Sequence, residues 1–147
     1  MIALLQRVNS AAVYINQENY NNINQGLLIF LGINCNDSIQ DIDYLLNKIV
    51  NLRIFDDSKN KMNLSISDIR GEILLVSQFT LLADTKKGRR PSFIKSANPE
   101  LAKNLYNIFI KKLNKTNLTI KTGQFGAMMD IKLTNSGPAT FILNSDS

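Results

Sequence analysis

The sequence predicts an α/β (α+β) fold, in which a mixed or antiparallel β-sheet, or a barrel-like sheet, carries two main helices packed on one side. Two observations support this prediction. The expected strands outnumber the expected helices, in the order β-β-β-α-β-α-β-β-β. No repeat, low-complexity block or linker interrupts the 147 residues, of which 44% are hydrophobic and 20% are charged. We therefore expect a single domain over residues 1–147.

The beginning of the chain has the pattern of β-structure. Residues 2–8 and 11–15 are expected to form short strands joined by Asn9-Ser10, and the asparagine-rich residues 16–25 a hairpin or a loop. Residues 27–33 are almost continuously apolar, which predicts a buried strand. The remaining expected strands cover residues 72–76, 118–121, 127–133 and 139–143.

Two segments carry the start signals of helices. Asp37 or Ser38 is suited to cap a helix that runs to about Leu52, and Asn98 is a good N-cap because Pro99 follows at the first helical position. In both segments apolar residues then recur at helical spacing. They are Ile39, Ile42, Leu45, Leu46 and Ile49 in the first segment, and Leu101, Leu105, Ile108, Phe109 and Leu113 in the second.

The composition excludes several kinds of catalysis. The chain has no histidine and one cysteine, Cys35, so it has no Ser-His-Asp triad, no Cys-His pair, no histidine-ligated zinc and no internal disulfide. We expect no metal and no nucleotide cofactor, and we expect Cys35 to be a buried or half-buried residue near a strand end. The cysteine usage and the absence of a long apolar stretch also predict a cytoplasmic protein that enters no membrane.

The ionisable residues are divided unevenly along the chain. Residues 1–85 carry six basic and nine acidic side chains, net −3, whereas residues 86–147 carry eleven basic and three acidic side chains, net +8. The densest basic cluster contains Lys86, Lys87, Arg89 and Arg90. This asymmetry favours a surface that meets a polyanion such as RNA, with phosphates binding at the cluster. The alternative is a solvated basic face without a partner.

Ser77-Gln78-Phe79-Thr80 directly follows the expected strand that ends at Val76. Its polar groups should emerge where the chain changes direction and backbone N–H groups are left free. Such donors, aimed at a developing oxyanion, stabilise a transition state by roughly 3 kcal/mol each without a titrating side chain. The alternative is an ordinary strand terminus.

Two glycine-containing segments follow later in the chain. Gly137-Pro138 lies between two expected strands and indicates a turn, which a fold can hold as a rigid elbow because a cis bond before proline costs only about 0.5–1 kcal/mol. A stiff glycine carbonyl beside the Cα of a ligand would distinguish mirror-image ligands by steric clash. Phe125 and Gly126 precede another strand, and Phe125 is either a core residue or a platform for a base. Met129 is most simply a core filler.

Four motifs appear together and in order. They are Ser77-Gln78-Phe79-Thr80-Leu81, Lys87-Gly88-Arg89-Arg90-Pro91-Ser92-Phe93, Thr122-Gly123-x-Phe125-Gly126-Ala127 and Asn135-x-Gly137-Pro138-x-Thr140. With these motifs the chain resembles the D-aminoacyl-tRNA deacylase family, over essentially the whole domain.

The resemblance implies a homodimeric esterase, without metal or cofactor, that cleaves D-amino acids from the 3′ end of aminoacyl-tRNA and also removes mischarged glycine. It implies that Gly137-Pro138 of one subunit, with a cis bond, reaches into the pocket of the other subunit and reads the chiral centre. Ser77, Gln78, Phe79 and Thr80 correspond to the pocket segment in this family. Phe125, Gly126 and Met129 match neighbouring motif positions that are expected to line the pocket.

Three residues depart from the family pattern. Met128 stands where an acidic residue is frequent, Ala139 where valine is common, and Gln124 where a basic residue is frequent. These departures bear on local packing, on substrate preference and on one phosphate contact more than on the type of reaction.

Two mechanisms fit this inventory of residues. Thr80 is one candidate nucleophile, but no general base adjoins it in the sequence. In the second mechanism, which we prefer, the neighbouring ribose hydroxyl of the substrate, or a water that it positions, assists the attack, while backbone N–H groups near Phe79 and Thr80 stabilise the oxyanion. A noncatalytic RNA-binding module, with Phe125 as a stacking surface, is the main alternative. A structural dimer with a degenerate site is a third possibility.

Overall fold

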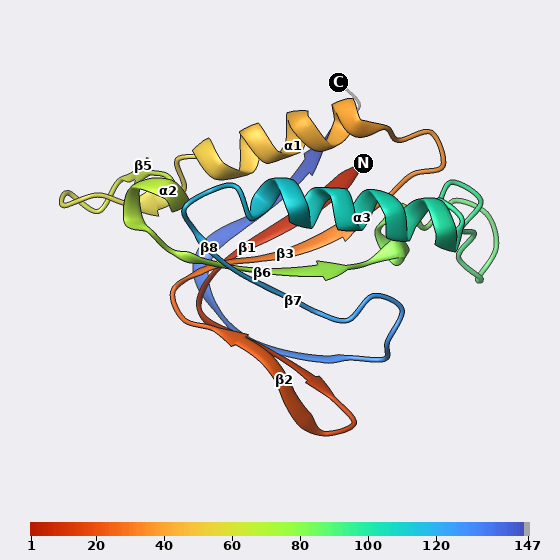
Figure 1. Cartoon of the computed structure of the whole chain (residues 1–147), viewed down its shortest axis with the longest axis horizontal. Helices are drawn as coiled ribbons and strands as arrows, with labels where there is room; N and C mark the ends of the chain where they lie inside the picture. The colour runs from red at the N-terminus through yellow and green to blue at the C-terminus, as the bar shows by residue number, and fades with distance from the viewer. Residues whose placement is uncertain (146–147) are drawn as a thin grey trace.

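The computed structural model describes residues 1–145, which form a six-stranded mixed sheet with helices on one side and a separate two-stranded sheet (Figure 1). The strands of the six-stranded sheet are β1 (Ile2–Ile15), β2 (Glu18–Ile23), β3 (Gly26–Gly32), β6 (Glu72–Ser77), β7 (Thr119–Thr122) and β8 (Asp130–Asn144). Their order is β2-β1-β3-β6-β7, and β8 pairs with β1. The sheet is strongly curved and nearly closed, which confirms the predicted fold class.

The pairing of β1 organises the whole sheet. On one side β1 pairs with β8 along most of its length, and on the other side it pairs first with β3 and then, from Ala11 onward, with β2. All three pairings are antiparallel, whereas β3–β6 and β6–β7 are parallel. Both β3 and β6 are buried on both faces, which explains their nearly continuous apolar sequences.

Two helices, α1 (Ile39–Asn51) and α3 (Pro99–Leu113), cover one face of the sheet (Figure 1). Both begin where the sequence predicts. The N–H and hydroxyl groups of Ser38 donate to the carboxylate of Asp41, each at 2.8 Å. The Oδ1 atom of Asn98 accepts from the N–H of Leu101 at 2.9 Å. The predicted apolar stripes pack into the larger of two hydrophobic cores, with one exception. Ile39, the first residue of α1, is 47% exposed, so its predicted place in the stripe was wrong.

Four short elements were not predicted. They are β4 (Phe55–Asp56), β5 (Met62–Leu64), α2 (Ile66–Ile69) and the 3₁₀ helix η1 (Phe79–Leu82). Gly32 allows η1 to pack against the end of β3, because a Cβ atom there would lie 3.1 Å from both the carbonyl oxygen of Gln78 and the Cβ atom of Leu81. The position of η1 follows from this close approach.

The structure corrects several predicted boundaries. Residues 2–15 form one strand, because pairing with β8 continues past Asn9-Ser10, with shifts of register that absorb the irregularity. Residues 130–144 likewise form one strand, β8, in which Gly137-Pro138 lies within the strand and not at a turn. Residues 127–129 precede β8 instead of opening it. Residues 16–25 contain β2 as the second arm of a hairpin.

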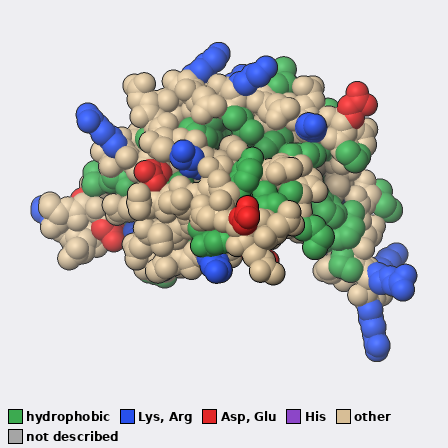
Figure 2. Space-filling model, turned by 60° about the horizontal axis from the view of Figure 1, so that its bottom comes forward, with side chains coloured by type: hydrophobic (Ala, Val, Ile, Leu, Met, Phe, Trp, Pro, Cys, Tyr) green, Lys and Arg blue, Asp and Glu red, His purple; other side chains and the backbone are tan. Residues whose placement is uncertain are grey.

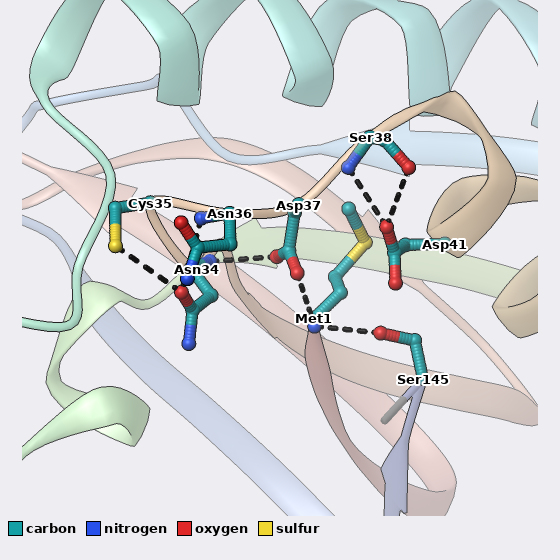
Figure 3. A network of polar contacts seen from close by, with 8 residues as sticks. All are labelled: Met1, Asn34, Cys35, Asn36, Asp37, Ser38, Asp41 and Ser145. Carbon is teal, nitrogen blue, oxygen red and sulfur yellow. Dashed lines mark hydrogen bonds and ion pairs between the residues drawn. The ribbon is translucent and has the colours of Figure 1, made fainter. Parts of the chain in front are cut away.

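The prediction for Cys35 was wrong, since this residue is exposed. It lies in the turn between β3 and α1, where the side chain of Asp37 binds the N–H of Asn34 at 2.6 Å (Figure 3). The same carboxylate lies 2.6 Å from the α-ammonium group of Met1, which also donates to Ser145 Oγ at 2.7 Å. Burial raises the pKa of Asp37, and the hydrogen bond from the ammonium group acts in the opposite direction.

Candidate active site

A cavity of about 630 Å³ opens where β6 ends, between η1, the beginning of α3 and the segment that precedes β8. Its lining contains no ionisable side chain. The lining residues are Leu31, Ile33, Val76, Ser77, Gln78, Phe79, Ser96, Ala97, Pro99, Ala102, Phe125, Gly126, Ala127, Met128, Met129 and Ile131. Any chemistry at this place therefore depends on neutral polar groups, on the backbone and on the substrate.

The cavity brings together two motifs that are far apart in the sequence. Ser77, Gln78 and Phe79 line it from the end of β6 and the start of η1. Phe125, Gly126 and Met129 line it from the segment between β7 and β8. Six of the predicted pocket residues thus surround one space, and their role in a reaction stays a prediction.

The backbone of η1 offers unused donors beside this cavity. The N–H of Gln78 donates to the carbonyl of Leu31 at 2.8 Å and so anchors the segment to β3. Within residues 1–145, the N–H groups of Phe79 and Thr80 have no hydrogen-bond partner, because they belong to the first turn of the 3₁₀ helix. These two groups are the donors that the sequence predicts for an oxyanion site, and that role stays a prediction.

Thr80 itself is exposed and does not line the cavity. Its hydroxyl oxygen accepts a hydrogen bond from the side-chain amide of Gln78. An amide N–H donor cannot take up a proton, so this contact orients the hydroxyl group without activating it as a nucleophile.

Gly137-Pro138 does not line the cavity of its own chain. The bond between the two residues is cis, and both residues are exposed. Ile131, which does line the cavity, lies six residues earlier in β8, a separation of about 20 Å along a strand. Within one chain the elbow and the cavity are therefore distant from each other.

Arg7 of β1 binds the backbone of the Gly137-Pro138 elbow. This arginine is buried, with 6% of its surface exposed. Its guanidinium group donates to the carbonyl of Ser136 at 3.1 Å and to that of Gly137 at 3.4 Å. It also donates to the carbonyl of Ile54 at 2.7 Å and pairs with Asp56 at 3.2 Å. One side chain thus ties the elbow to β4, a contact that the sequence did not reveal.

The predicted basic residues lie outside the cavity. Lys86, Lys87, Arg89 and Arg90 are exposed on a loop that is closed by paired backbone hydrogen bonds between Asp84 and Ser92, at 2.8 and 2.9 Å. After this loop, Phe93 packs edge-on against Phe79 at the rim of the cavity, with ring centroids 5.0 Å apart. The basic loop and the cavity are thus neighbours on one surface.

Sequence reasoning missed part of the lining. Ser96, Ala97, Pro99 and Ala102 bound the cavity from the beginning of α3 and the loop before it. Small residues without periodicity give no signal, and only the helix start at Asn98 marked this region. Behind the lining residue Phe125 lies the buried Tyr106, with the ring centroids 5.5 Å apart. The hydroxyl of Tyr106 donates to the carbonyl of Leu75 at 2.9 Å, and burial raises the pKa of this hydroxyl.

The departures noted in the sequence fall in different places. Met128 lines the cavity mouth and is 92% exposed. An apolar side chain therefore stands at the mouth, at the position where an acidic residue is frequent in the family. Ala139 is fully buried beside the elbow. Gln124 is exposed. Among residues 1–145, no group of three or more cysteine, aspartate or glutamate side chains is placed to hold a metal ion.

The chain matches the family of D-Tyr-tRNA(Tyr) deacylases over residues 4–144. It is 56% identical over 147 residues to the D-aminoacyl-tRNA deacylase of Finegoldia magna, covering 100% of this chain and 99% of that one. It is 54% identical over 146 residues to the D-aminoacyl-tRNA deacylase of Thermosipho melanesiensis, covering 99% and 97%.

Two solved structures share the fold. One, described as a c-Myc DNA unwinding element binding protein, aligns with a TM-score of 0.95 and 39% identity over 100% of both chains. The other, described as a probable eukaryotic D-amino acid tRNA deacylase, aligns with a TM-score of 0.84 over 97% of both chains. At 17% identity, the second match supports the fold alone.

Proposed function

Because the chain belongs to the D-Tyr-tRNA(Tyr) deacylase family, we propose that the cavity beside η1 is where it hydrolyses the ester of D-aminoacyl-tRNA. The activity itself is that of a D-aminoacyl-tRNA deacylase, a carboxylic ester hydrolase, as the family and its curated relatives indicate. The observation that supports this location is the convergence of two distant motifs on one cavity, next to two unpaired backbone N–H groups.

The reaction adds water to the ester carbonyl and releases the ribose oxygen. As water attacks, the carbonyl oxygen becomes an oxyanion, which accepts hydrogen bonds from the N–H groups of Phe79 and Thr80. Each such donor is worth roughly 3 kcal/mol in the transition state. The neighbouring ribose hydroxyl positions the water, and the proton that water loses goes to the departing ribose oxygen. The products are a free D-amino acid and tRNA.

This mechanism needs no titrating side chain, in keeping with the lining of the cavity. It also leaves Thr80 in a supporting role, because the hydroxyl of Thr80 accepts a hydrogen bond from an amide and adjoins no base. RNA esters are therefore expected to be cleaved, whereas simple amino-acid esters, which lack the ribose hydroxyl, are expected to be poor substrates.

Selection of handedness requires a second copy of the chain. We assign it to Gly137-Pro138 of the partner, which enters the cavity and excludes the side chain of an L-residue, while glycine passes. A thousandfold discrimination corresponds to about 4 kcal/mol, which a rigid steric wall can supply. The exposure of the elbow and its distance from the cavity of its own chain support this arrangement.

The surface of β8 favours such a homodimer. Among the described residues, β8 pairs only with β1, so the other edge of this 15-residue strand carries unpaired backbone groups. Leu133 and Ile142 on β8 are exposed apolar residues, the latter at 68%. Pairing of two copies along this region would cover both features.

The decisive experiment compares the hydrolysis of D-, L- and glycyl-tRNA by the purified chain, with and without the free vicinal hydroxyl of the terminal ribose. We expect cleavage of the D- and glycyl esters, retention of the L-ester, and a large loss of rate without the hydroxyl. Serial dilution in the same assay should lower the ratio of D- to L-ester cleavage once dimers dissociate. Equal hydrolysis of D- and L-esters at every protein concentration would contradict the proposed selection.

A second candidate function is nucleic-acid binding without catalysis. It is favoured by the basic loop and by the 39% identity to a structure described as a DNA unwinding element binding protein. A pure binder would shift the mobility of charged tRNA in a gel without shortening the lifetime of its ester.

For the cellular location, we propose the cytoplasm, where charged tRNA is used. Among residues 1–145, no helix is long and apolar enough to span a membrane.

A further inference from the structure

A row of exposed residues leads away from the cavity mouth. Phe79 at the rim is 58% exposed, Phe93 is 36% exposed, and Ile94 is 88% exposed. Lys95 follows and is also exposed. We call Phe93, Ile94 and Lys95 the outer strip. Hydrophobic side chains gather on one part of the face in Figure 2, and a group of protruding Lys and Arg side chains lies beside them.

The outer strip adjoins a second depression, whose lining includes Lys95 of the strip and Leu81 and Leu82 of η1. This depression, of about 340 Å³, is lined by the two cationic residues Lys86 and Lys95. Asn34, Thr85 and Asn144 add neutral polar groups. The one acidic residue of the lining, Asp84, already accepts a hydrogen bond from the backbone N–H of Lys86 at 2.9 Å.

The cations near the outer strip have no acidic partners. Within residues 1–145, none of the five basic side chains from Lys86 to Lys95 forms an ion pair with a carboxylate. An array of unpaired cations attracts a polyanion and releases counterions when it binds one. This surface therefore differs from an ordinary solvated face, where opposite charges are interspersed.

The backbone under the outer strip is well held. The N–H of Cys35 donates to the carbonyl of Lys95, and the N–H of Ala97 donates to that of Ile33, both at 2.9 Å. The N–H of Ser96 donates to the carbonyl of Phe93 at 2.9 Å. The exposed side chains are thus presented on a fixed backbone, as a stacking surface requires.

From these observations we propose that the outer strip and the depression bind the single-stranded nucleotides that precede the esterified one at the 3′ end of the RNA. A base stacks on the exposed face of Phe93, and a backbone phosphate lies between Lys86 and Lys95. Aromatic faces alternating with cations are the usual means of binding single-stranded nucleic acid. This proposal rests on the proposed function, since it extends the path of the substrate outward from the cavity.

The test uses two substrates that differ only in the upstream nucleotides: D-aminoacyl-tRNA and the 3′-ester of a D-amino acid with adenosine alone. For Phe93→Ala and for Lys95→Ala, we expect the KM for charged tRNA to rise about tenfold, because one stacked base or one phosphate contact is lost. The kcat for charged tRNA and both constants for the adenosine ester should stay within twofold of the wild type.

Matched controls come from α1, where Tyr44 is 40% exposed and Lys48 lies over its ring. Tyr44→Ala and Lys48→Ala should leave the kinetics on both substrates unchanged. Salt provides a further readout: the slope of log KM against log salt for charged tRNA should fall by about 0.7 in Lys95→Ala, as expected for one phosphate contact to a single strand.

Three results would overturn the proposal. The first is an equal loss on both substrates, which would place Phe93 and Lys95 in the cavity site itself. The second is a change in the molecular mass of the assembly, which would show that the strip lies between two copies. The third is unchanged KM for charged tRNA in both variants.

A separate binding measurement distinguishes failure of this proposal from failure of the proposed function. If the wild-type chain cleaves neither ester, the affinity for a short uncharged single-stranded RNA is measured by fluorescence anisotropy. Weaker binding by Phe93→Ala and Lys95→Ala, but not by the α1 controls, would support the outer strip on its own. Equal binding by all variants would refute it.

Discussion

Arg7 offers the sharpest test of how the elbow is held. Replacing it by methionine removes the bonds to the carbonyls of Ser136 and Gly137, at 3.1 and 3.4 Å. At about 0.5–1.5 kcal/mol for each bond, the tether is worth about 1–3 kcal/mol. If the elbow must be rigid to exclude L-residues, Arg7→Met should lower the ratio of D- to L-ester cleavage by about 5- to 150-fold.

The same change also lowers the free energy of unfolding. The buried carbonyl of Ile54 loses its donor, which costs about 1–3 kcal/mol. The half-exposed Asp56 loses an ion pair worth at most about 1 kcal/mol. Together with the tether of about 1–3 kcal/mol, these terms give an expected total loss of about 2–7 kcal/mol, measured by urea unfolding. Arg7→Lys keeps the charge but cannot reach the four acceptors with one planar group, so it should lose selectivity as well.

The assay compares initial rates of deacylation on D- and L-aminoacyl-tRNA below the temperature at which the variants unfold. Arg53→Lys is the matched control, because Arg53 is an exposed arginine that donates to the carbonyl of Asn63 at 2.7 Å. This control should leave the ratio unchanged. A normal D/L ratio in Arg7→Met, together with reduced stability, would show that Arg7 supports only the fold and that the reasoning about the elbow is wrong.

Three further predictions concern the elbow, the chain start and acid stability. Gly137→Ala should reduce D-ester cleavage with little loss of stability, since the new Cβ atom would have its nearest contact at 3.5 Å; normal cleavage would count against a close approach to the substrate. Asp37→Asn should cost about 3 kcal/mol in urea unfolding, because the buried ammonium of Met1 loses its counterion, and an unchanged midpoint would contradict this. Hydrogen bonds from the backbone N–H and then the hydroxyl of Ser65 lower the pKa of Asp68 below its ordinary 3.8. Its stabilising contribution is therefore present above pH 4 and is lost as the pH falls through the lowered pKa, so Asp68→Asn should flatten the acid limb of the stability curve.

The sequence predicted those features that are determined locally. The apolar sequences of β3 and β6 and the capping residues of α1 and α3 marked buried strands and helix starts at nearly the correct places. The continuity of β1 and β8 was not predictable in this way. Asn9-Ser10 and Gly137-Pro138 are locally typical of turns, but the pairing of β1 with β8 continues on both sides of them, with shifts of register between Gln6 and Ser10.

The residues of the candidate site likewise fall into those that the sequence predicted and those that only the fold reveals. Ser77, Gln78 and Phe79 could be named from their position after a buried strand, and Phe125 and Gly126 from their motif. The contribution of Ser96 and its neighbours depends on the packing of a loop against β3, which no local pattern records. Arg7 likewise has the sequence context of an ordinary strand residue, and only the fold brings it under the elbow.

A site without ionisable side chains has consequences for the whole reaction. Since the cavity lining cannot exchange protons near neutral pH, the proposed function assigns the contribution of the fold to fixed geometry, namely unpaired N–H groups on η1 and a steric wall on β8. Fixed geometry of this kind requires that η1 and the Gly137-Pro138 elbow are both anchored to the rest of the fold. The hydrogen bond from Gln78 to β3 anchors η1, and the contacts of Arg7 with Ile54 and Asp56 anchor the elbow. Because Gly137 lies about 20 Å along β8 from Ile131 of the cavity lining, the proposed function makes assembly of two chains the step that creates selectivity.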